Sequence, residues 1–314
     1  MLSYLAGRLA QALPVVLLAS IAVFLVLRLV PGDPADAIAG EDASPEEVRT
    51  IREQLGLTDP IPVQYGRWIG DLLQGDFGVS IRTGVPVSEL IKLAFPPTIE
   101  LAVASYAVAV VVGIPLGTIA GVRPRSLWDW FLSFYTIGTL GIPNFLLGVL
   151  LLWAFAIGLG WFPASGRVSF FDDPLQSTRY LALPALALGS GLAAALARYT
   201  RTTVQEVMGQ DYIRTARAKG LAERHVVVRH ALRNSLIPVV TIMALQVGQL
   251  LAGAVVIERV FTRPGLGRLV VDAILNRDYL IVQSTLVILV VIFVGVNLVA
   301  DVAYGVLDPR VRRR

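Results

Sequence analysis

The side chains that most often carry out catalysis are scarce in this sequence. No cysteine is present to join the two histidines, His225 and His230, in a metal site. Neither an HExxH nor a GxSxG motif occurs, and neither Lys92 nor Lys219 follows a glycine, as the lysine of a phosphate-binding P-loop does. We therefore expect no catalytic residue, no metal site and no cofactor in this chain. If ATP and Mg²⁺ drive its activity, separate subunits must bind them.

Three amides lie well inside long apolar segments, where polar groups are costly and are usually kept for function. They are Asn144, Gln246 and Gln249, and the two glutamines share a helix face because they are three residues apart. Two interpretations are open: the amides line a polar path across a membrane, or they form hydrogen bonds between helices. No carboxylate lies in the middle of an apolar segment, although transporters coupled to protons or sodium usually bury one there.

The stretch from Asp211 to Pro238 is the longest strongly charged run between two apolar segments. Gly220 divides it, since glycine permits a positive φ and a sharp turn. Apolar residues recur at three- and four-residue steps before the glycine, at Val204, Val207, Met208, Tyr212 and Ala216, and resume after it at Val226, Val227, Ala231 and Leu232. The pattern predicts two short helices at an angle, projecting from the membrane. They either dock on another protein or form a basic loop that sets topology and touches anionic lipid.

The elements that must position these residues are membrane-spanning helices. Of the 314 residues 55% are hydrophobic and 16% are charged, with a mean hydropathy of +0.68, which is typical of a polytopic, all-α membrane protein. Six segments are long enough to cross a bilayer: Leu9–Val30, Thr98–Val122, Phe131–Ile157, Leu181–Tyr199, Leu236–Ile257 and Val282–Ala303.

The loops differ in charge in a way that predicts orientation. Residues 31–97 hold eleven acids and five bases, whereas residues 198–234 hold eight bases and three acids. Because lysine and arginine accumulate on cytoplasmic loops, we expect the basic loop and both termini in the cytoplasm. Residues 31–97 then lie outside.

The outer region is expected to be a small helical insert over the outer mouth of the bundle. Ser44 to Glu47 read as a helix start with a capping box, and a second helix is expected at Tyr65–Leu73. The insert either is a structural lid or receives a partner protein. The chain thus divides into residues 1–30, the insert 31–97 and a five-helix core 98–314, with the basic loop at about 200–235.

At the basic loop the sequence resembles the permease subunits of ATP-binding-cassette importers, and within them the dipeptide/oligopeptide/nickel type with a large first outer loop. RTARAKGL at 214–221, HALRN at 230–234 and Pro238 are typical of that branch. Arg214, Thr215 and Ala216 stand where the wider family has Glu-Ala-Ala. Further matches cover the whole chain: LRLVPGDPA at 27–35, QLGLTDPIPVQYGRW at 54–68, GDFGVS at 75–80, IERVFTRPGLGRL at 257–269, RDY at 277–279 and LDPRVR at 307–312.

The resemblance implies the type I importer permease fold in the plasma membrane of a prokaryote. It implies a sister permease that completes a heterodimer, two cytoplasmic ATPase subunits, an extracytoplasmic substrate-binding protein, and no nucleic acid. The chain would form half of the path for di- or oligopeptides and would not itself be an enzyme. The residues expected to couple it to the ATPases are Arg214, Thr215, Ala216, Arg217, Lys219 and Gly220.

Pro264, Gly265 and Gly267 predict a turn after the fifth span. By its position this segment resembles an outer gate or a re-entrant loop, and the alternative is a loop packed under the insert. Two other functions are open for the whole chain. A self-sufficient secondary transporter or channel would show mid-span carboxylates and internal repeats, which are not found. A membrane-anchored scaffold or receptor would need no polar path.

Overall fold

The computed structural model describes residues 2–29, 35, 44–54 and 56–307. In these ranges every regular element is a helix, and a single isolated bridge joins Val79 and Pro86. The all-α prediction is therefore confirmed. The elements, including two π-helices labelled η, are α1 (Leu2–Leu29), α3 (Pro45–Gln54), α4 (Ile61–Leu73), α5 (Val87–Val122), α6 (Leu127–Gly141), α7 (Asn144–Leu151), η1 (Leu152–Gly158), α8 (Pro174–Met208), α9 (Asp211–Ala218), α10 (Glu223–His225), η2 (Val226–Leu232), α11 (Arg233–Val260), α12 (Leu266–Leu275) and α13 (Tyr279–Leu307).

Five of the described helices are long and apolar enough to cross a membrane, at Gly7–Val26, Val87–Val122, Pro174–Met208, Pro238–Val260 and Tyr279–Val299. The third predicted span is not one straight helix. It is divided into α6 and α7–η1, which meet at an angle of 101°. Pro143 explains the break, because proline drives the preceding residue out of the helical region, and Ile142 is extended at φ −104° and ψ 124°.

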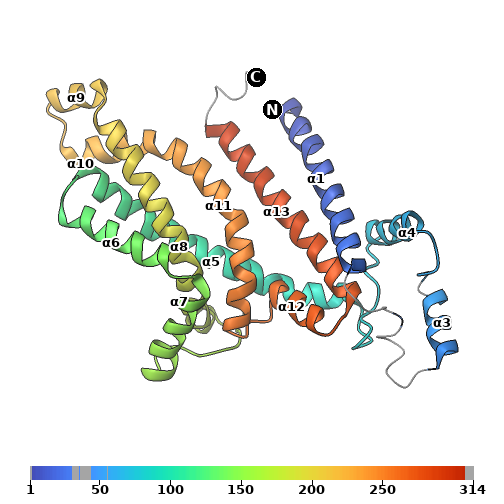
Figure 1. Cartoon of the computed structure of the whole chain (residues 1–314). Coiled ribbons are helices and arrows are strands. Elements are labelled where there is room, and N and C mark those ends of the chain that lie inside the picture. Colours follow the sequence, from blue (N-terminus) through green and yellow to red (C-terminus); the bar gives the residue numbers. More distant parts are fainter. Residues whose placement is uncertain (1, 30–34, 36–43, 55, 308–314) are drawn as a thin grey trace.

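Helices α5 and α8 form the most extensive helix–helix contact in the described residues, and they approach each other closely along a row of glycines. Gly113, Gly117 and Gly121 recur every four residues on α5, and a Cβ added at Gly117 would lie 2.4 Å from the carbonyl oxygen of Ala197. Such small residues let two helix backbones pack closely inside a membrane. Figure 1 shows α8 crossing α5, which continues behind α11 toward α12.

Helix α5 begins at Val87, eleven residues before the predicted start of the second span at Thr98. Its added turns carry Val87 and Ile91 into an apolar cluster with Leu266 of α12 and Val282 of α13. Pro96 and Pro97 lie within the helix and do not end it. Residues 87–97, assigned above to the outer insert, thus belong to a membrane-spanning helix.

The insert begins as the sequence predicts. Ser44 and Glu47 form the reciprocal capping box, with the Glu47 N–H donating to Ser44 Oγ at 3.3 Å and the Ser44 N–H donating to the Glu47 carboxylate at 2.8 Å. The box starts α3. Gly56, which follows this helix, has φ +63°.

Helix α4 packs against the C-terminal half of α1, beside the bundle. Phe24 of α1 stacks on Trp68 at 5.6 Å and meets Tyr65 edge-on at 5.3 Å, while Tyr65 Oη and Ser20 Oγ are 2.8 Å apart. Figure 1 shows α3 and α4 at the margin beyond α1. The two helices therefore lie beside α1. The insert was expected to cover the outer mouth of the bundle, but α3 and α4 do not extend over α5, α8 and α11.

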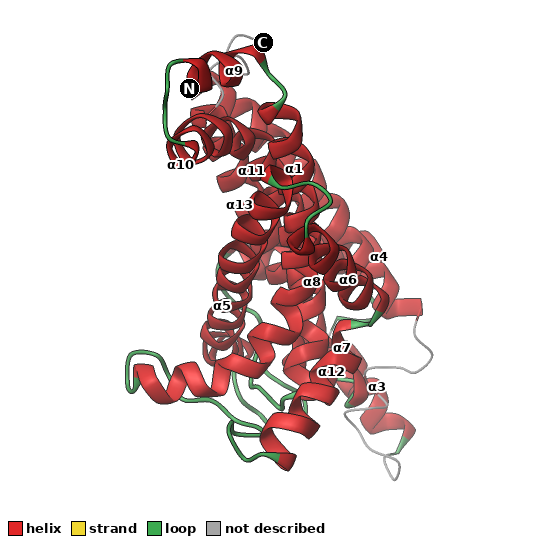
Figure 2. Cartoon of the chain, turned by 90° about the vertical axis from the view of Figure 1, so that its left-hand side faces the viewer, coloured by secondary structure: helices red, strands yellow, loops and turns green. Residues whose placement is uncertain are grey.

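A later part of the insert does reach the core. Ser80, which is buried, donates to Asp278 Oδ2 at 2.6 Å, and Gly78 packs against Leu280. Figures 1 and 2 show the start of α1 and the end of α13 at the same end of the molecule as α9 and α10, with α12 toward the opposite end. The basic loop and the α12 region thus mark the two ends of the bundle.

Candidate functional site

Helix α9 turns its apolar face toward its own chain. Ile213 and Ala216 are 0% and 7% exposed and pack with Val226 and Ala231 of η2. Part of the predicted stripe, Val207 and Met208, borders the same cluster. The chain itself thus covers most of the stripe, except that Tyr212 is exposed and Ile213 is buried in its place. The exposed residues of α9 and of the turn after it are Asp211, Tyr212, Arg214, Thr215, Arg217, Ala218, Lys219 and Gly220.

Gly220 makes the predicted turn with a positive φ of +76°. The turn is closed by hydrogen bonds from the Gly220 N–H to the Arg217 carbonyl at 2.9 Å and from the Leu221 N–H to the Ala216 carbonyl at 3.4 Å. A Cβ at this position would meet no atom within 4 Å. Gly220 is therefore required by its backbone conformation and leaves open space around the turn.

Two side-chain contacts fix the angle between α9 and the helices that follow. Arg217 holds Glu223 in a bidentate pair at 2.7 and 3.1 Å across the turn. This hydrogen bonding lowers the pKa of Glu223 and raises that of Arg217. Asn234, in the first turn of α11, donates to Tyr212 Oη at 3.0 Å. Helix α9 is thus tied to both α10 and α11.

The three mid-span amides lie in different surroundings. Gln246 is buried and donates to the Leu192 carbonyl of α8 at 3.3 Å, so it links two helices. Asn144 is half-buried, and its amide lies beside Gly191 of α8 and Gly253 of α11. Gln249 is exposed. The structure thus joins Gln246 and Asn144 to the same stretch of α8 and leaves Gln249 on the surface of α11.

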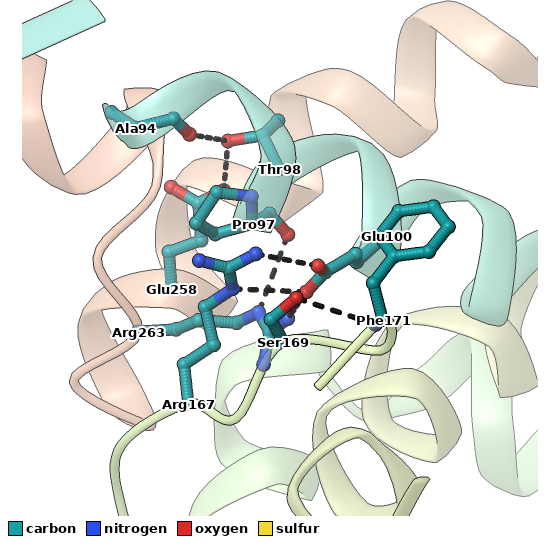
Figure 3. A network of polar contacts seen from close by, with 9 residues as sticks. All are labelled: Ala94, Pro97, Thr98, Glu100, Arg167, Ser169, Phe171, Glu258 and Arg263. Atoms are coloured by element: carbon teal, nitrogen blue, oxygen red, sulfur yellow. Dashed lines mark hydrogen bonds and ion pairs between the residues drawn. The ribbon is translucent and has the colours of Figure 1, made fainter. Parts of the chain in front are cut away.

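A buried polar network at the other end of the bundle was not predicted from the sequence. Glu258, completely buried near the end of α11, accepts from Thr98 Oγ1 at 2.6 Å and from the Arg268 backbone N–H at 3.1 Å. Thr98 in turn accepts from the Leu266 N–H at 2.8 Å. Figure 3 shows the bond between Thr98 and Glu258. The two side chains together satisfy N–H groups in the first turn of α12, which otherwise have no helical partner.

Two arginines from different loops converge on Glu100 of α5 (Figure 3). Arg263, 1% exposed, lies 2.5 Å from the Glu100 carboxylate and donates through Nε to the Pro97 carbonyl at 3.3 Å. Arg167, from the segment between η1 and α8, holds Glu100 at 2.6 and 3.1 Å. Burial lowers the pKa of Arg263, whereas hydrogen bonding to Glu100 raises that of Arg167. The network therefore connects α5, α11, α12 and the segment before α8.

The predicted turn at Pro264 depends on close packing. Gly265 is extended with φ −100°, and a Cβ there would lie 2.1 Å from the Glu258 carboxylate. At Gly267 a Cβ would lie 2.4 Å from the Cα of Val255. The positive φ of the turn, +52°, belongs to Thr262. An acidic residue, Glu258, stands six positions before the Pro-Gly-x-Gly turn that begins at Pro264. That spacing is the signal in the sequence that could have indicated a carboxylate packed on the glycines.

Both parts of the chain match models of one family of known proteins. Residues 113–313 match the family model described as the inner membrane component of binding-protein-dependent transport systems, and residues 1–102 match its N-terminal component. The chain belongs to this family. It is a permease of the peptide type of ATP-binding-cassette importer, as the motifs of the basic loop indicated.

Curated relatives match the permease over nearly its full length. It is 45% identical over 305 residues to a putative peptide transport system permease protein of Brucella abortus (strain 2308), with 97% of each chain covered. It is 43% identical over 314 residues to the glutathione transport system permease protein GsiC of Escherichia coli (strain K12), with 99% of each covered.

Among solved structures, the permease fold resembles a chain of the inward-facing MetNI methionine ABC transporter. The TM-score is 0.56 at 19% sequence identity, and the match covers 70% of this chain and 96% of the other. At this identity the likeness establishes the fold of the helical core. It agrees with the predicted importer permease architecture.

Proposed function

We propose that this permease forms half of the translocation path of an ATP-driven importer for di- or oligopeptides, and that α9 couples the path to a separate ATPase subunit. The observation that carries the proposal is the packing of α9. Its apolar face is buried within its own chain, and Arg214, Arg217 and Lys219 are exposed on the helix and on the turn that follows it. A helix held in this way can transmit force from a partner as a rigid lever.

The coupling runs through contacts described above. Because Arg217 fixes α9 to α10 and Tyr212 bonds to Asn234, a displacement of α9 moves the start of α11 with it. In this scheme Arg214, Thr215, Lys219 and Gly220 meet the ATPase, while Arg217 sets the angle of the lever. Ala216, for which tight contact with the partner was expected, is assigned a positioning role because it packs on η2.

The substrate class, the orientation in the membrane and the translocation path are each supported by a separate observation. The substrate class follows the relatives, which are named as peptide and glutathione permeases. The charge of residues 198–234 favours a cytoplasmic basic loop and cytoplasmic termini, so the insert would face the binding protein. Within the residues described, Asn144 and Gln249 are the amides that a path shared with a sister permease could use.

The contacts of the carboxylates in the spans favour the importer over a self-sufficient secondary transporter. Within the described spans Glu100 and Glu258 are held by the network near α12, and Asp129 pairs with Arg201 at 2.6 Å. None of these carboxylates lies free near Asn144 or Gln246, where a coupling ion would be expected to bind.

The proposal is tested by peptide uptake into vesicles that contain the complete transporter, with Gly220→Trp and Gly220→Asn compared. Asparagine tolerates a positive φ, so Gly220→Asn should retain most uptake. Tryptophan is strained there and fills the open space beside the turn, so uptake should fall at least about tenfold. Full uptake by Gly220→Trp, or uptake by the purified permease without any ATPase, contradicts the proposal.

A further inference from the structure

The π-helix after α9 carries a basic hollow that the proposed coupling contacts do not use. The hollow has a volume of about 630 Å³ and is lined by Ala222, Arg224, His225, Val228, Arg229 and Arg233. It lies on α10, η2 and the start of α11. The coupling surface, by contrast, lies on α9 and its turn.

The positive charge of the hollow has no internal counterion in the part of the chain that the structure describes. No carboxylate there pairs with Arg224, Arg229 or Arg233. The neighbouring acid, Glu223, is already held by two hydrogen bonds from Arg217. Several cations around one hollow repel each other, so an anion that enters it is favoured.

The π-helical geometry brings the arginines together. Arg224 lies in α10 just before η2, and Arg229 lies within η2 five residues later, so π-helical turns stand between them. Arg233, the first residue of α11, is four residues after Arg229. In a regular α-helix residues five apart do not share a face. The extra residue in the turn therefore helps to direct the guanidinium groups toward one hollow.

The height of the hollow fits the headgroup layer of a membrane. The apolar span of α11 begins at Pro238. Arg233 is five residues earlier on the same helix, or about 7.5 Å along its axis at a rise of 1.5 Å per residue. The polar headgroup layer is roughly 5–8 Å thick on each side of the hydrocarbon core. Val228, which is 57% exposed, adds an apolar contact beside the charges.

We propose that this hollow binds the phosphate-bearing headgroup of an anionic phospholipid. Guanidinium groups suit the ligand because they donate to phosphate oxygens in a bidentate fork. The acyl chains would extend from the headgroup layer along the apolar start of the α11 span. The site would fix the basic end of α11 to one leaflet beside the lever that α9 provides.

Native mass spectrometry of the permease tests this inference. The protein is purified from its own membrane with the subunits that accompany it, and phosphatidylglycerol or phosphatidylcholine is titrated in. Phosphatidylglycerol should bind at least about tenfold more tightly. The R229Q/R233Q variant should lose about 10- to 30-fold of that affinity, with phosphatidylcholine binding unchanged. R229K/R233K, which keeps the charges, should retain most of the preference.

The matched control is R123Q/R198Q. It removes two other exposed arginines for which no carboxylate partner is found in the described ranges, and it should leave the lipid preference intact. Equal affinity for the two lipids, or an unchanged preference in R229Q/R233Q, overturns the inference. Displacement of phosphatidylglycerol by millimolar inorganic phosphate would assign the hollow to a free anion instead. Loss of an accompanying subunit with lipid binding unaffected would assign it to a protein contact.

Discussion

At the scale of single residues, the buried ionisable side chains Glu258 and Arg263 set the geometry of one end of the permease. They are 0% and 1% exposed, and each is bonded to α5. A charge this deep is costly unless it is paired and hydrogen-bonded. Their contacts explain why Gly265 stands beside the carboxylate, where any larger residue would displace it.

Removing Arg263 should destabilise the protein more than removing Arg167, although both pair with Glu100. Arg263→Gln leaves a buried end of the network unpaired, at a cost of about 3 kcal/mol in the free energy of unfolding. The Arg167 side chain is 22% exposed, and Arg167→Gln should cost about 1 kcal/mol because solvent screens the pair. Thermal unfolding of the two variants in detergent measures the order, and equal shifts would show that burial does not decide it.

The Arg217–Glu223 pair should hold the α9 turn only while Glu223 is ionised. Because its pKa is lowered in the folded state, the contribution is present above the ordinary carboxyl range and is lost as pH falls through the lowered pKa. Both side chains are about half exposed, so the effect on global stability is small. Glu223→Gln mimics the protonated form and should speed amide hydrogen exchange at Gly220 and Leu221. Unchanged exchange there would show that the pair does not hold the turn.

At the scale of elements, the row of glycines on α5 is the contact least able to accept a larger side chain. In Gly117→Val the new Cβ meets the Ala197 carbonyl, and a backbone atom cannot rotate away. The helices must separate, at a cost of about 1–3 kcal/mol or more. The yield of folded permease in the membrane, measured by size-exclusion chromatography, should fall several-fold.

The control for this prediction is Gly138→Val on α6, where a Cβ would have no neighbour within 4 Å. It changes the same residue type in a helix of the same protein. Its yield should stay close to that of the native chain. An equal loss in both variants would mean that glycine content, and not the α5–α8 contact, sets the yield.

The sequence predicted the elements better than it predicted their contacts. The capping box at Ser44 and the turn at Gly220 are local signals, and both are present as expected. The break at Pro143 was missed because a continuous apolar run does not show how a proline is accommodated. The start of α5 was placed too late, at Thr98. The packing of Val87 and Ile91 against α12 and α13 explains why the helix begins earlier and continues through Pro96 and Pro97.

At the candidate sites, too, local patterns were predicted from the sequence and contacts between distant residues were not. Periodicity identified an apolar stripe on the basic loop, but it could not tell whether a partner or the chain itself covers the stripe. Burial of Ala216, and of Ile213 in place of Tyr212, shows that the chain itself covers most of the stripe. The network of Glu100, Glu258 and Arg263 joins residues more than 150 positions apart, and pattern analysis has no means to pair them.

At the scale of the whole molecule, the permease has a basic end and a network end joined by long helices. Helix α11 connects them, since it begins beside α9 and ends at Val260, two residues after Glu258. A movement imposed on α9 can therefore change how α11 meets α5 and α12. This geometry suits alternating access, in which opposite ends of a path open in turn.

The central claim is that α9 is the contact point for a separate ATPase, and crosslinking tests it most directly. The chain has no cysteine, so Thr215→Cys introduces a single thiol on the exposed face of α9, and Arg49→Cys places one on α3 as a control. With a short thiol–amine crosslinker on native membranes, Thr215→Cys should yield a product that joins the permease to the ATPase, and Arg49→Cys should not. The same product from both variants, or none from Thr215→Cys in a complex active in uptake, would contradict the account.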